Sequence, residues 1–194
     1  MLANCRDIEG ARDERASIRP CGAPELSTML MIINQAAQVY EGAIPADRWH
    51  SPYMSEWELE QEIAAGVAFV GYQRNGELVA VMGIQPVSNV DLIRHAYVLP
   101  AFQGLGIGGR LMSYLCDRSN RQILVGTWAA ATWATAFYER HGFRLTDRET
   151  KNLLLQTYWT VPAEQIDASV VLARPALTHE TAIRLIEEAG VPLR

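Results

Sequence analysis

The spacing of apolar residues predicts two helices near the start of the chain. After Pro24 the apolar positions lie three or four residues apart, at Leu26, Leu30, Ile33, Ala37 and Tyr40. This spacing puts them on one face of a helix, which Gly42 ends. Ser55 and Glu58 form an S-x-x-E capping box, which predicts a second helix ending near Gly66. The segment between the two helices holds two prolines and is expected to be a loop.

The hydrophobic period then changes from that of a helix to that of strands. Val67–Gln73 and Leu78–Ile84 are two strand-like runs, and Asn75-Gly76 lies between them. Asn-Gly tolerates the positive φ angles of a tight turn, so the three segments predict an antiparallel hairpin. Val90–Leu99 reads as a further long strand, which Pro100 halts. A shorter strand is expected at Ser17–Arg19, ahead of the first helix.

The rest of the chain alternates between helical and strand-like segments. A helix is expected after the turn at residues 103–109, because Ile107, Leu111 and Leu115 share one face. The elements expected after it are a strand at Gln122–Trp128, a helix at Thr132–His141, closing strands at Phe143–Leu145, Leu153–Thr160 and Asp167–Ala173, and a final helix at Thr178–Ala189. This order predicts an α/β fold with a mixed sheet and helices on both faces.

Length and patterning divide the chain into one domain with two appendages. The 194 residues suit a single domain. Residues 1–16 are polar and are expected to form a flexible tail. Residues 17–175 are expected to form the domain, and 176–194 a helical extension. That extension packs either on the domain or on a second subunit, so a homodimer is left open.

Composition excludes several classes of function. The formal net charge is -5 and there is no Lys/Arg block, which argues against a nucleic-acid or anionic-membrane partner. The three cysteines form no Cys-x-x-Cys pair, so neither a disulfide framework nor a metal site is expected. The N-terminus lacks an apolar signal segment, and no apolar stretch is long enough to span a bilayer. A cytoplasmic location is expected.

A glycine-rich turn is the segment that most clearly indicates a function. The run Gln103-Gly-Leu-Gly-Ile-Gly-Gly109 connects a strand to a helix. Main-chain N–H groups at the start of a helix have no intrahelical partner, and the helix dipole adds about half a positive charge there. Gly104, Gly106, Gly108 and Gly109 let the backbone approach an anion closely. The turn is therefore expected to cradle a diphosphate, and this explains how an acidic protein binds an anionic cofactor.

The turn has two other interpretations. Gly104, Gly106 and Gly109 also match the dinucleotide fingerprint G-x-G-x-x-G. Four residues separate the preceding strand from the turn, an antiparallel hairpin comes before it, and the strand at 122–128 has no acidic residue to bind a ribose. These features disfavour a nicotinamide-dependent oxidoreductase. The remaining interpretation is a glycine turn without a ligand.

Two segments resemble the GNAT superfamily of acyl-CoA N-acyltransferases. The run Val98-Leu-Pro-Ala-Phe-Gln-Gly-Leu-Gly-Ile-Gly108 resembles the superfamily signature V-x-P-x-x-Q/R-x-x-G-x-G/A. Downstream, Ala134-Thr-Ala-Phe-Tyr-Glu-Arg-His-Gly-Phe143 resembles its A-x-x-F-Y-x-x-x-G-F segment. The order of elements from Ser17 to Ala173 fits as well. The resemblance implies a mostly antiparallel sheet, acetyl-CoA as co-substrate, and a small-molecule or peptide amine as acceptor.

The resemblance also implies roles for individual residues. The main chain of Val98 would bind the pantetheine amides, and an N–H at Val98 or Leu99 would polarise the thioester carbonyl. The pyrophosphate would be held by Gln103, Gly104, Leu105, Gly106, Ile107, Gly108 and Gly109, together with Arg110. Tyr138 matches the tyrosine that points at the CoA sulfur. A phenol that titrates near 10 is suited to protonate a leaving thiolate, although packing alone would also explain Tyr138. Phe137 and Phe143 are expected in the core, and His141 is expected to stabilise the end of its helix as a cation.

The general base is not apparent from the sequence. Relatives often place a glutamate or histidine six or four residues before the position of Val98, but here those positions are Leu92 and Arg94. Because side chains alternate along a strand, Asp91 and His95 are expected to face the other side, with His95 packed or hydrogen-bonded. Weaker candidates for the base are Asp47, His50 and Glu56, and a water chain is the remaining alternative. Relatives also carry an asparagine seven residues before the tyrosine, where this chain has Ala131, with Thr127, Trp128 and Thr132 nearby.

Two functions follow from these patterns. The first is an N-acetyltransferase in which an amine attacks the thioester directly, with an acceptor pocket drawn from the aromatic residues Trp49, Tyr53, Trp57, Trp128 and Trp133. The second is a non-catalytic acyl-CoA sensor or partner-binding module, which the missing base and asparagine motivate. The acceptor and the acyl chain length are not identified by the sequence.

Overall fold

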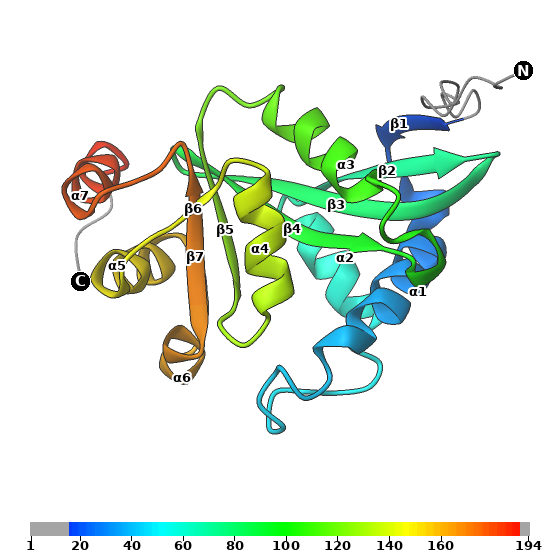
Figure 1. Ribbon diagram of the computed structural model, residues 1–194, viewed down its shortest axis with the longest axis horizontal. Helices are drawn as coiled ribbons and strands as arrows, with labels where there is room; N and C mark the ends of the chain where they lie inside the picture. Colours follow the sequence, from blue (N-terminus) through cyan, green and yellow to red (C-terminus); the bar gives the residue numbers. More distant parts are fainter. Residues whose placement is uncertain (1–15, 191–194) are drawn as a thin grey trace, which may run out of the picture.

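A seven-stranded sheet forms the centre of the protein (Figure 1). The computed structural model describes residues 16–190, and the expected tail and the last four residues of the expected extension fall outside this range, apart from Ala16. The strands are β1 (Ala16–Pro20), β2 (Ala68–Arg74), β3 (Glu77–Val87), β4 (Val90–Val98), β5 (Gln122–Trp128), β6 (Arg144–Leu145) and β7 (Ser169–Arg174). They lie in the order β1-β2-β3-β4-β5-β7-β6.

Every neighbouring pair of strands is antiparallel except β4 and β5. The predicted hairpin is β2–β3, and its turn places Asn75 at φ 52° and Gly76 at φ 88°. These left-handed angles are the ones that Asn and Gly tolerate best. The prediction of a mixed, mostly antiparallel sheet is therefore confirmed.

Helices cover both faces of the sheet. The helices are α1 (Leu26–Ala37), α2 (Glu56–Ala64), α3 (Ile107–Cys116), α4 (Thr132–Arg140), α5 (Arg148–Tyr158), α6 (Ala163–Asp167) and α7 (His179–Glu188), with short 3-10 turns at Ala23–Glu25, Gln38–Tyr40 and Pro100–Phe102. Ile93 of β4 packs in the core beneath α3 and α4. Its neighbour Leu92 packs in the core beneath α5 and α7. Because consecutive strand residues face opposite sides, α5 and α7 lie on the face opposite α3 and α4. Tyr97, on β4, packs with the core under α1 and α2.

One predicted element is wrong. The run Leu153–Thr160 was expected to be a strand, but the chain forms α5 there. Asp147 caps this helix, because its Oδ1 accepts a hydrogen bond from the Thr150 N–H at 2.8 Å. The buried positions at 151, 154, 155 and 158 repeat at helical spacing. The start signal lies six residues before the apolar run, and the run by itself does not separate a strand from a helix.

The parallel pair β4–β5 separates part of the way along its length. The strands pair from Val90 opposite Gln122 to Ile93 opposite Val125, and the pairing stops there although both strands continue. The remaining halves of the two strands, 94–98 and 126–128, therefore diverge. They leave main-chain groups of both strands without a partner on the neighbouring strand, which is an opening for a ligand.

A β-bulge in β4 lies at this point of divergence. The pairing with β3 shifts register between Arg94 and Tyr97, so that His95 and Ala96 lie opposite a single residue of β3. His95 has a φ of 49°, a left-handed angle that is uncommon for a residue other than glycine. The side chains of Arg94 and His95 both contact Glu62 of α2. The expectation that His95 faces the opposite side from Arg94 is therefore wrong, because the bulge interrupts the alternation.

The final helix packs on α5 within the same chain. Asn89 Nδ2 donates to the Leu185 carbonyl at 2.7 Å, and the Tyr158 hydroxyl donates to Asn89 Oδ1 at 3.0 Å. Ala182 and Ile186 are buried against this part of the core. None of the helices in residues 16–190 is long and apolar enough to cross a membrane.

Candidate functional site

The turn between β4 and α3 presents unpaired main-chain donors. The first helical hydrogen bond of α3 runs from Arg110 N–H to the Gly106 carbonyl at 3.1 Å. The N–H groups of residues 104–109 meet no acceptor elsewhere in the part of the chain that the structure describes. Six amides without a partner, at the positive end of a helix, are the donors that the predicted anion site requires.

The glycines of this turn fall into two groups. Gly104 and Gly106 have φ angles of 77° and 74°, and a Cβ added to either would meet nothing within 4 Å. These two glycines therefore bend the backbone and leave its outer side open. A Cβ at Gly108 would lie 3.2 Å from the Phe137 ring, and one at Gly109 would lie 2.5 Å from His141 Nε2. The missing side chains of Gly108 and Gly109 let α3 pack against α4, and their main-chain N–H groups stay predicted donors to the anion.

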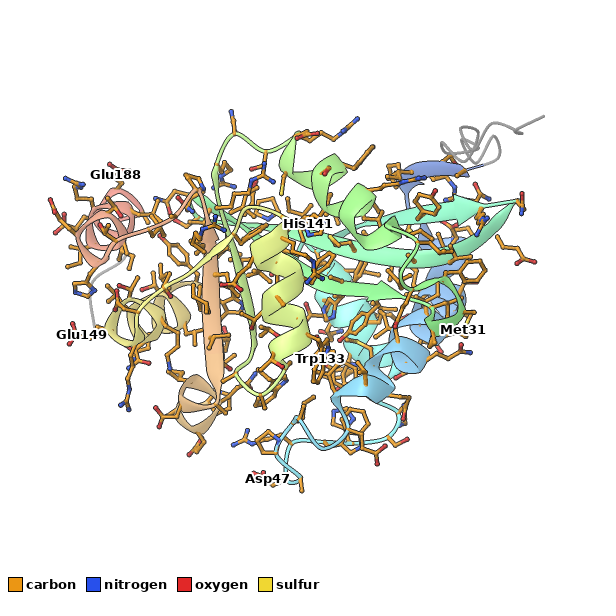
Figure 2. All side chains as sticks on the ribbon, viewed as in Figure 1. Met31, Asp47, Trp133, His141, Glu149 and Glu188 are labelled. Carbon is orange, nitrogen blue, oxygen red and sulfur yellow. The ribbon has the colours of Figure 1, made fainter. Side chains whose placement is uncertain are left out.

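The contact between Gly109 and His141 predicts an effect on stability. The His141 ring is held in place because its Nδ1–H donates to the Phe137 carbonyl at 2.7 Å, and Figure 2 shows His141 at the end of α4 that faces α3. Replacing Gly109 by Ala in an unobstructed helix would stabilise it by roughly 1 kcal/mol. Here we expect a loss of about 1–3 kcal/mol in the free energy of unfolding, because the new methyl group overpacks the helix contact.

Denaturant unfolding measures this loss, and a second substitution identifies its cause. Adding His141→Ala to Gly109→Ala removes the obstructing ring, so the double variant should lose less stability than the sum of the single variants. A Gly109→Ala protein as stable as the parent would contradict the packing role.

The polar side chains of the turn are already engaged with the protein. Gln103 Nε2 donates to the Val98 carbonyl at 3.1 Å, which ties the turn to the end of β4. Arg110 Nη1 donates to the Tyr72 hydroxyl at 2.7 Å. The Leu105 side chain is exposed and that of Ile107 is buried in the core. Leu105 and Ile107 therefore offer an anion only their main-chain groups.

The main chain of Val98 faces the opening between β4 and β5. The Leu99 N–H donates to the Val79 carbonyl of β3 at 3.0 Å. Neighbouring residues of an antiparallel strand direct their polar groups to opposite sides, so the N–H and C=O of Val98 point away from β3. Of the two amides that the sequence suggests for the thioester carbonyl, that of Leu99 is occupied and that of Val98 is directed into the opening.

A cavity of about 210 Å³ occupies this opening. It is lined on the strands by residues 93–97 and 125–128, and on α4 by Tyr138. On the opposite face of the sheet it reaches Tyr40 and Tyr53 on one side, and Trp159 and Gln165 on the other. The cavity thus joins the α3–α4 face of the sheet to the space between α1–α2 and α5–α6.

Tyr138 is the phenol on the α4 side of the cavity. Its side chain is buried, and its ring packs edge-on against Phe137 and Phe143 at centroid distances of 5.3 and 5.9 Å. Burial raises the pKa of Tyr138 far above its usual value, and the nearby Tyr40 and Tyr53 add to this shift. The phenol therefore keeps its proton at neutral pH and acts as a donor. Phe143 is fully buried, as predicted for a core residue.

Three more tyrosines gather on the other side of the cavity. Tyr53 stacks on Tyr40 at 6.4 Å and meets Tyr97 edge-on at 6.2 Å. Tyr40, Tyr53 and Tyr97 all line the cavity, together with Thr127 of β5. Burial raises the pKa of Tyr40 to about 12. These phenols are neutral hydrogen-bonding groups at physiological pH, set among aromatic faces.

The aromatic pocket expected from the sequence is partly correct. Tyr53 and Trp128 line the cavity, whereas Trp57 is 67% exposed on α2. Trp49 packs on Tyr53 and Trp133 on Tyr40, outside the lining. Trp159 was missed, because the segment that carries it was read as a strand.

The candidates for a general base are not brought to the cavity. Asp47 and Glu56 are exposed. His50 Nε2 lies 4.0 Å from Glu58 Oε1. Among residues 16–190, neither these two carboxylates nor His50 lines the cavity. Asp91 accepts hydrogen bonds from Ser119 at 2.6 Å and Arg121 at 3.1 Å, so it fastens the start of β4 to the loop before β5. In the described part of the chain, no three His, Cys, Asp or Glu side chains are grouped so as to hold a metal ion.

Comparisons with known proteins agree with this geometry. The sequence model of the acetyltransferase (GNAT) domain matches residues 34–155. No curated protein matches the chain. Several solved structures have the same fold. The N-acetyltransferase PaiA of Thermoplasma acidophilum, in complex with coenzyme A, has a TM-score of 0.62 at 15% identity, over 81% of this chain and 97% of its own.

Two further structures share this fold. A GNAT family acetyltransferase of Staphylococcus aureus has a TM-score of 0.61 at 19% identity, over 81% of this chain and 97% of its own. A GNAT family acetyltransferase of Elizabethkingia anophelis with acetyl-CoA bound has a TM-score of 0.53 at 21% identity, over 82% and 97%. At these identities the likeness concerns the fold, and the match of the domain covers most of the chain. The protein belongs to the GNAT acetyltransferase family.

Proposed function

We propose that this protein transfers an acetyl group from acetyl-CoA to the amine of a small molecule or peptide. The observation that carries the proposal is the continuity of three features. The free amides of residues 104–109 lie at one end, the inward-facing Val98 N–H lies at the opening of β4 and β5, and the Tyr138 phenol lines the same cavity. The diphosphate, the thioester carbonyl and the sulfur of acetyl-CoA need an anion site, a carbonyl donor and a proton donor in that order.

The reaction is a direct aminolysis of the thioester. The amine nitrogen attacks the carbonyl carbon, a C–N bond forms and the C–S bond breaks. The Val98 N–H stabilises the charge that develops on the carbonyl oxygen. The Tyr138 phenol donates its proton to the leaving sulfur, and the attacking nitrogen loses a proton to a base.

The side of the cavity that lies away from α3 and α4 is suited to bind the acceptor amine. The side bounded by Tyr53, Trp159 and Gln165 lies across the sheet from α3 and α4, so an amine reaches the thioester from the side opposite the diphosphate site. A cavity of this size accommodates the reacting end of an acceptor, and aromatic faces surround it. The similar structure from Thermoplasma acidophilum is an N-acetyltransferase, which supports nitrogen as the acceptor atom.

Mixing the protein with acetyl-CoA and a panel of amines tests the proposal. We expect free thiol to appear with at least one amine and the product to carry the acetyl group on nitrogen, as shown by mass spectrometry. Tight binding of acetyl-CoA without thiol release would favour the non-catalytic sensor. The reason to consider a sensor is the buried Ala131, which stands where relatives carry a polar residue. Stabilisation by NAD(H) and not by CoA would favour the oxidoreductase.

A further inference from the structure

The acyl transfer proposed above leaves one proton without an acceptor. Many amines titrate near 10 and arrive as ammonium ions, so a base must remove a proton before or during attack. Leu92 is apolar and buried, and the Arg94 guanidinium donates to both Glu62 carboxylate oxygens at 2.7 and 2.8 Å. Neither accepts a proton.

The bulge in β4 brings a histidine to this place. His95 is one of the residues that line the cavity, and its backbone is held at a φ of 49°. A left-handed angle in a residue other than glycine costs free energy, and such angles concentrate at functional sites. The bulge turns the imidazole to the α2 side of the sheet, where it stacks on Phe69 at a centroid distance of 5.7 Å. This is the side from which the acceptor approaches.

The two nitrogens of the His95 ring have different surroundings. Nε2 is buried and lies 3.3 Å from Glu62 Oε2. Nδ1 makes no hydrogen bond within residues 16–190 and is not closed off from solvent. A carboxylate at Nε2 favours the tautomer with the proton on that nitrogen, which leaves the lone pair on Nδ1. A neutral imidazole with an accessible lone pair is a base.

Charged groups lie beside the His95 ring. Burial raises the pKa of Glu62, but the nearby His95 ring and the charge of Arg94 outweigh burial and hold that pKa below its usual value. Glu62 therefore stays ionised beside the ring. The charged and titratable neighbours are Glu62 of α2, Arg94 of the same strand and Tyr53 from the segment before α2, while Phe69 of β2 does not titrate. The Glu62 carboxylate is therefore placed to bind the Arg94 guanidinium and, once His95 has taken up a proton, the imidazolium as well.

We propose that His95 is the general base for the acceptor amine and that Glu62 orients it. This inference depends on the proposed acetyl transfer. As the nitrogen–carbon bond forms, a proton passes from the amine to Nδ1 of His95 through one water, and Glu62 stabilises the imidazolium at Nε2. After the product leaves, His95 releases its proton to solvent and the Tyr138 phenolate takes up a proton from solvent. Tyr138 supplies the separate proton that the sulfur takes.

His95→Gly is the sharpest variant, because glycine adopts a φ of 49° without strain. Two acceptors are compared at pH 7: the best alkylamine from the thiol-release assay, and its β,β,β-trifluorinated analogue, which is neutral at that pH. With the alkylamine we expect kcat/KM to fall about 100-fold. With the analogue we expect a much smaller fall, because its nitrogen arrives neutral and the one proton it still has to lose is far more acidic. Adding imidazole should restore part of the rate with the alkylamine.

Further measurements separate catalysis from structure. Raising the pH should recover part of the rate of His95→Gly with the alkylamine, because more of that amine is then neutral. Glu62→Gln should lower kcat and retain binding of acetyl-CoA by calorimetry. His179→Gln, which alters a histidine on α7 outside the cavity, is the matched control and should leave the rate unchanged.

The outcomes distinguish this inference from the function on which it depends. An equal loss with both amines, with no recovery by imidazole or alkali, would overturn the base role and leave the acetyltransferase intact. A His95→Gln protein that folds and keeps the parent rate would overturn it as well. A parent protein that releases no thiol with any amine would overturn both the function and the base.

Discussion

Replacing Tyr138 by Phe is expected to lower kcat by about 100- to 10,000-fold, the range in which a positioned proton donor contributes. The substitution removes one hydroxyl and keeps the ring that packs against Phe137 and Phe143. The dissociation constant for CoA should change little, because the diphosphate is held at the other end of the cofactor. Steady-state kinetics with acetyl-CoA and calorimetry with CoA measure the two quantities.

The direction of the pKa shift adds a pH test. Burial raises the pKa of Tyr138 above its usual value near 10. The phenol is therefore protonated at every pH below about 10, and its loss of the proton should not lower the parent rate within that range. A fall in rate between pH 8 and 10 that disappears in Tyr138→Phe would contradict this assignment.

Tyr158→Phe is the matched control for this substitution. Tyr158 is also a buried tyrosine, but it lies on α5, donates to Asn89 and is not among the residues that line the cavity. Removing its hydroxyl should lower the free energy of unfolding by roughly 1 kcal/mol and leave kcat unchanged. If both variants lost activity equally, the effect at Tyr138 would be one of packing.

The parts of the site that the sequence predicts are those set by short-range chemistry. The turn at 103–109 follows from glycines at fixed offsets and from the start of an amphipathic helix, and both features lie within a dozen residues. Tyr138 is identified through the resemblance of the segment Ala134–Phe143 to the GNAT superfamily. In each case the residues that define the feature are neighbours in the chain, so a local pattern contains the information.

The parts that the sequence does not predict depend on contacts between distant segments. The bulge at His95 and Ala96 arises where β3 and β4 pair with one residue more on β4. The alternation of side chains along a strand, which has a period of two, cannot reveal an extra residue. Beyond the bulge, strict alternation assigns every side chain of the strand to the wrong face. The position of His95 beside Glu62 follows from this shift and from the packing of α2.

The wall of the cavity could not be predicted for a related reason. Trp159 and Gln165 belong to a stretch whose apolar residues read as a strand, and its helical structure depends on the Asp147 cap and on packing against α7. Tyr40 and Tyr53 come from the other end of the chain. Only the sheet order brings these two groups to opposite sides of one opening.

Replacing Gly106 by Val is expected to weaken the binding of acetyl-CoA roughly 1000-fold. Gly106 begins α3 at a φ of 74°, and a side chain there would project into space that is open in the protein. Valine at this angle is strained by about 1–2 kcal/mol. Its branches would also hold the diphosphate away from the amides. Each charge-assisted hydrogen bond contributes about 1.5–3 kcal/mol, so losing two of them gives an effect of this size.

Gly76→Val separates the strain from the blocked site. Gly76 has a φ of 88°, and a Cβ there also meets nothing within 4 Å, but it lies in the β2–β3 turn. Both variants should lose stability for the same backbone reason, as thermal unfolding without ligand would show. Only Gly106→Val should lose the stabilisation that acetyl-CoA gives. Equal affinity in both variants would mean that the diphosphate is not held by this turn, and the assignment of the cavity to a thioester would lose its anchor.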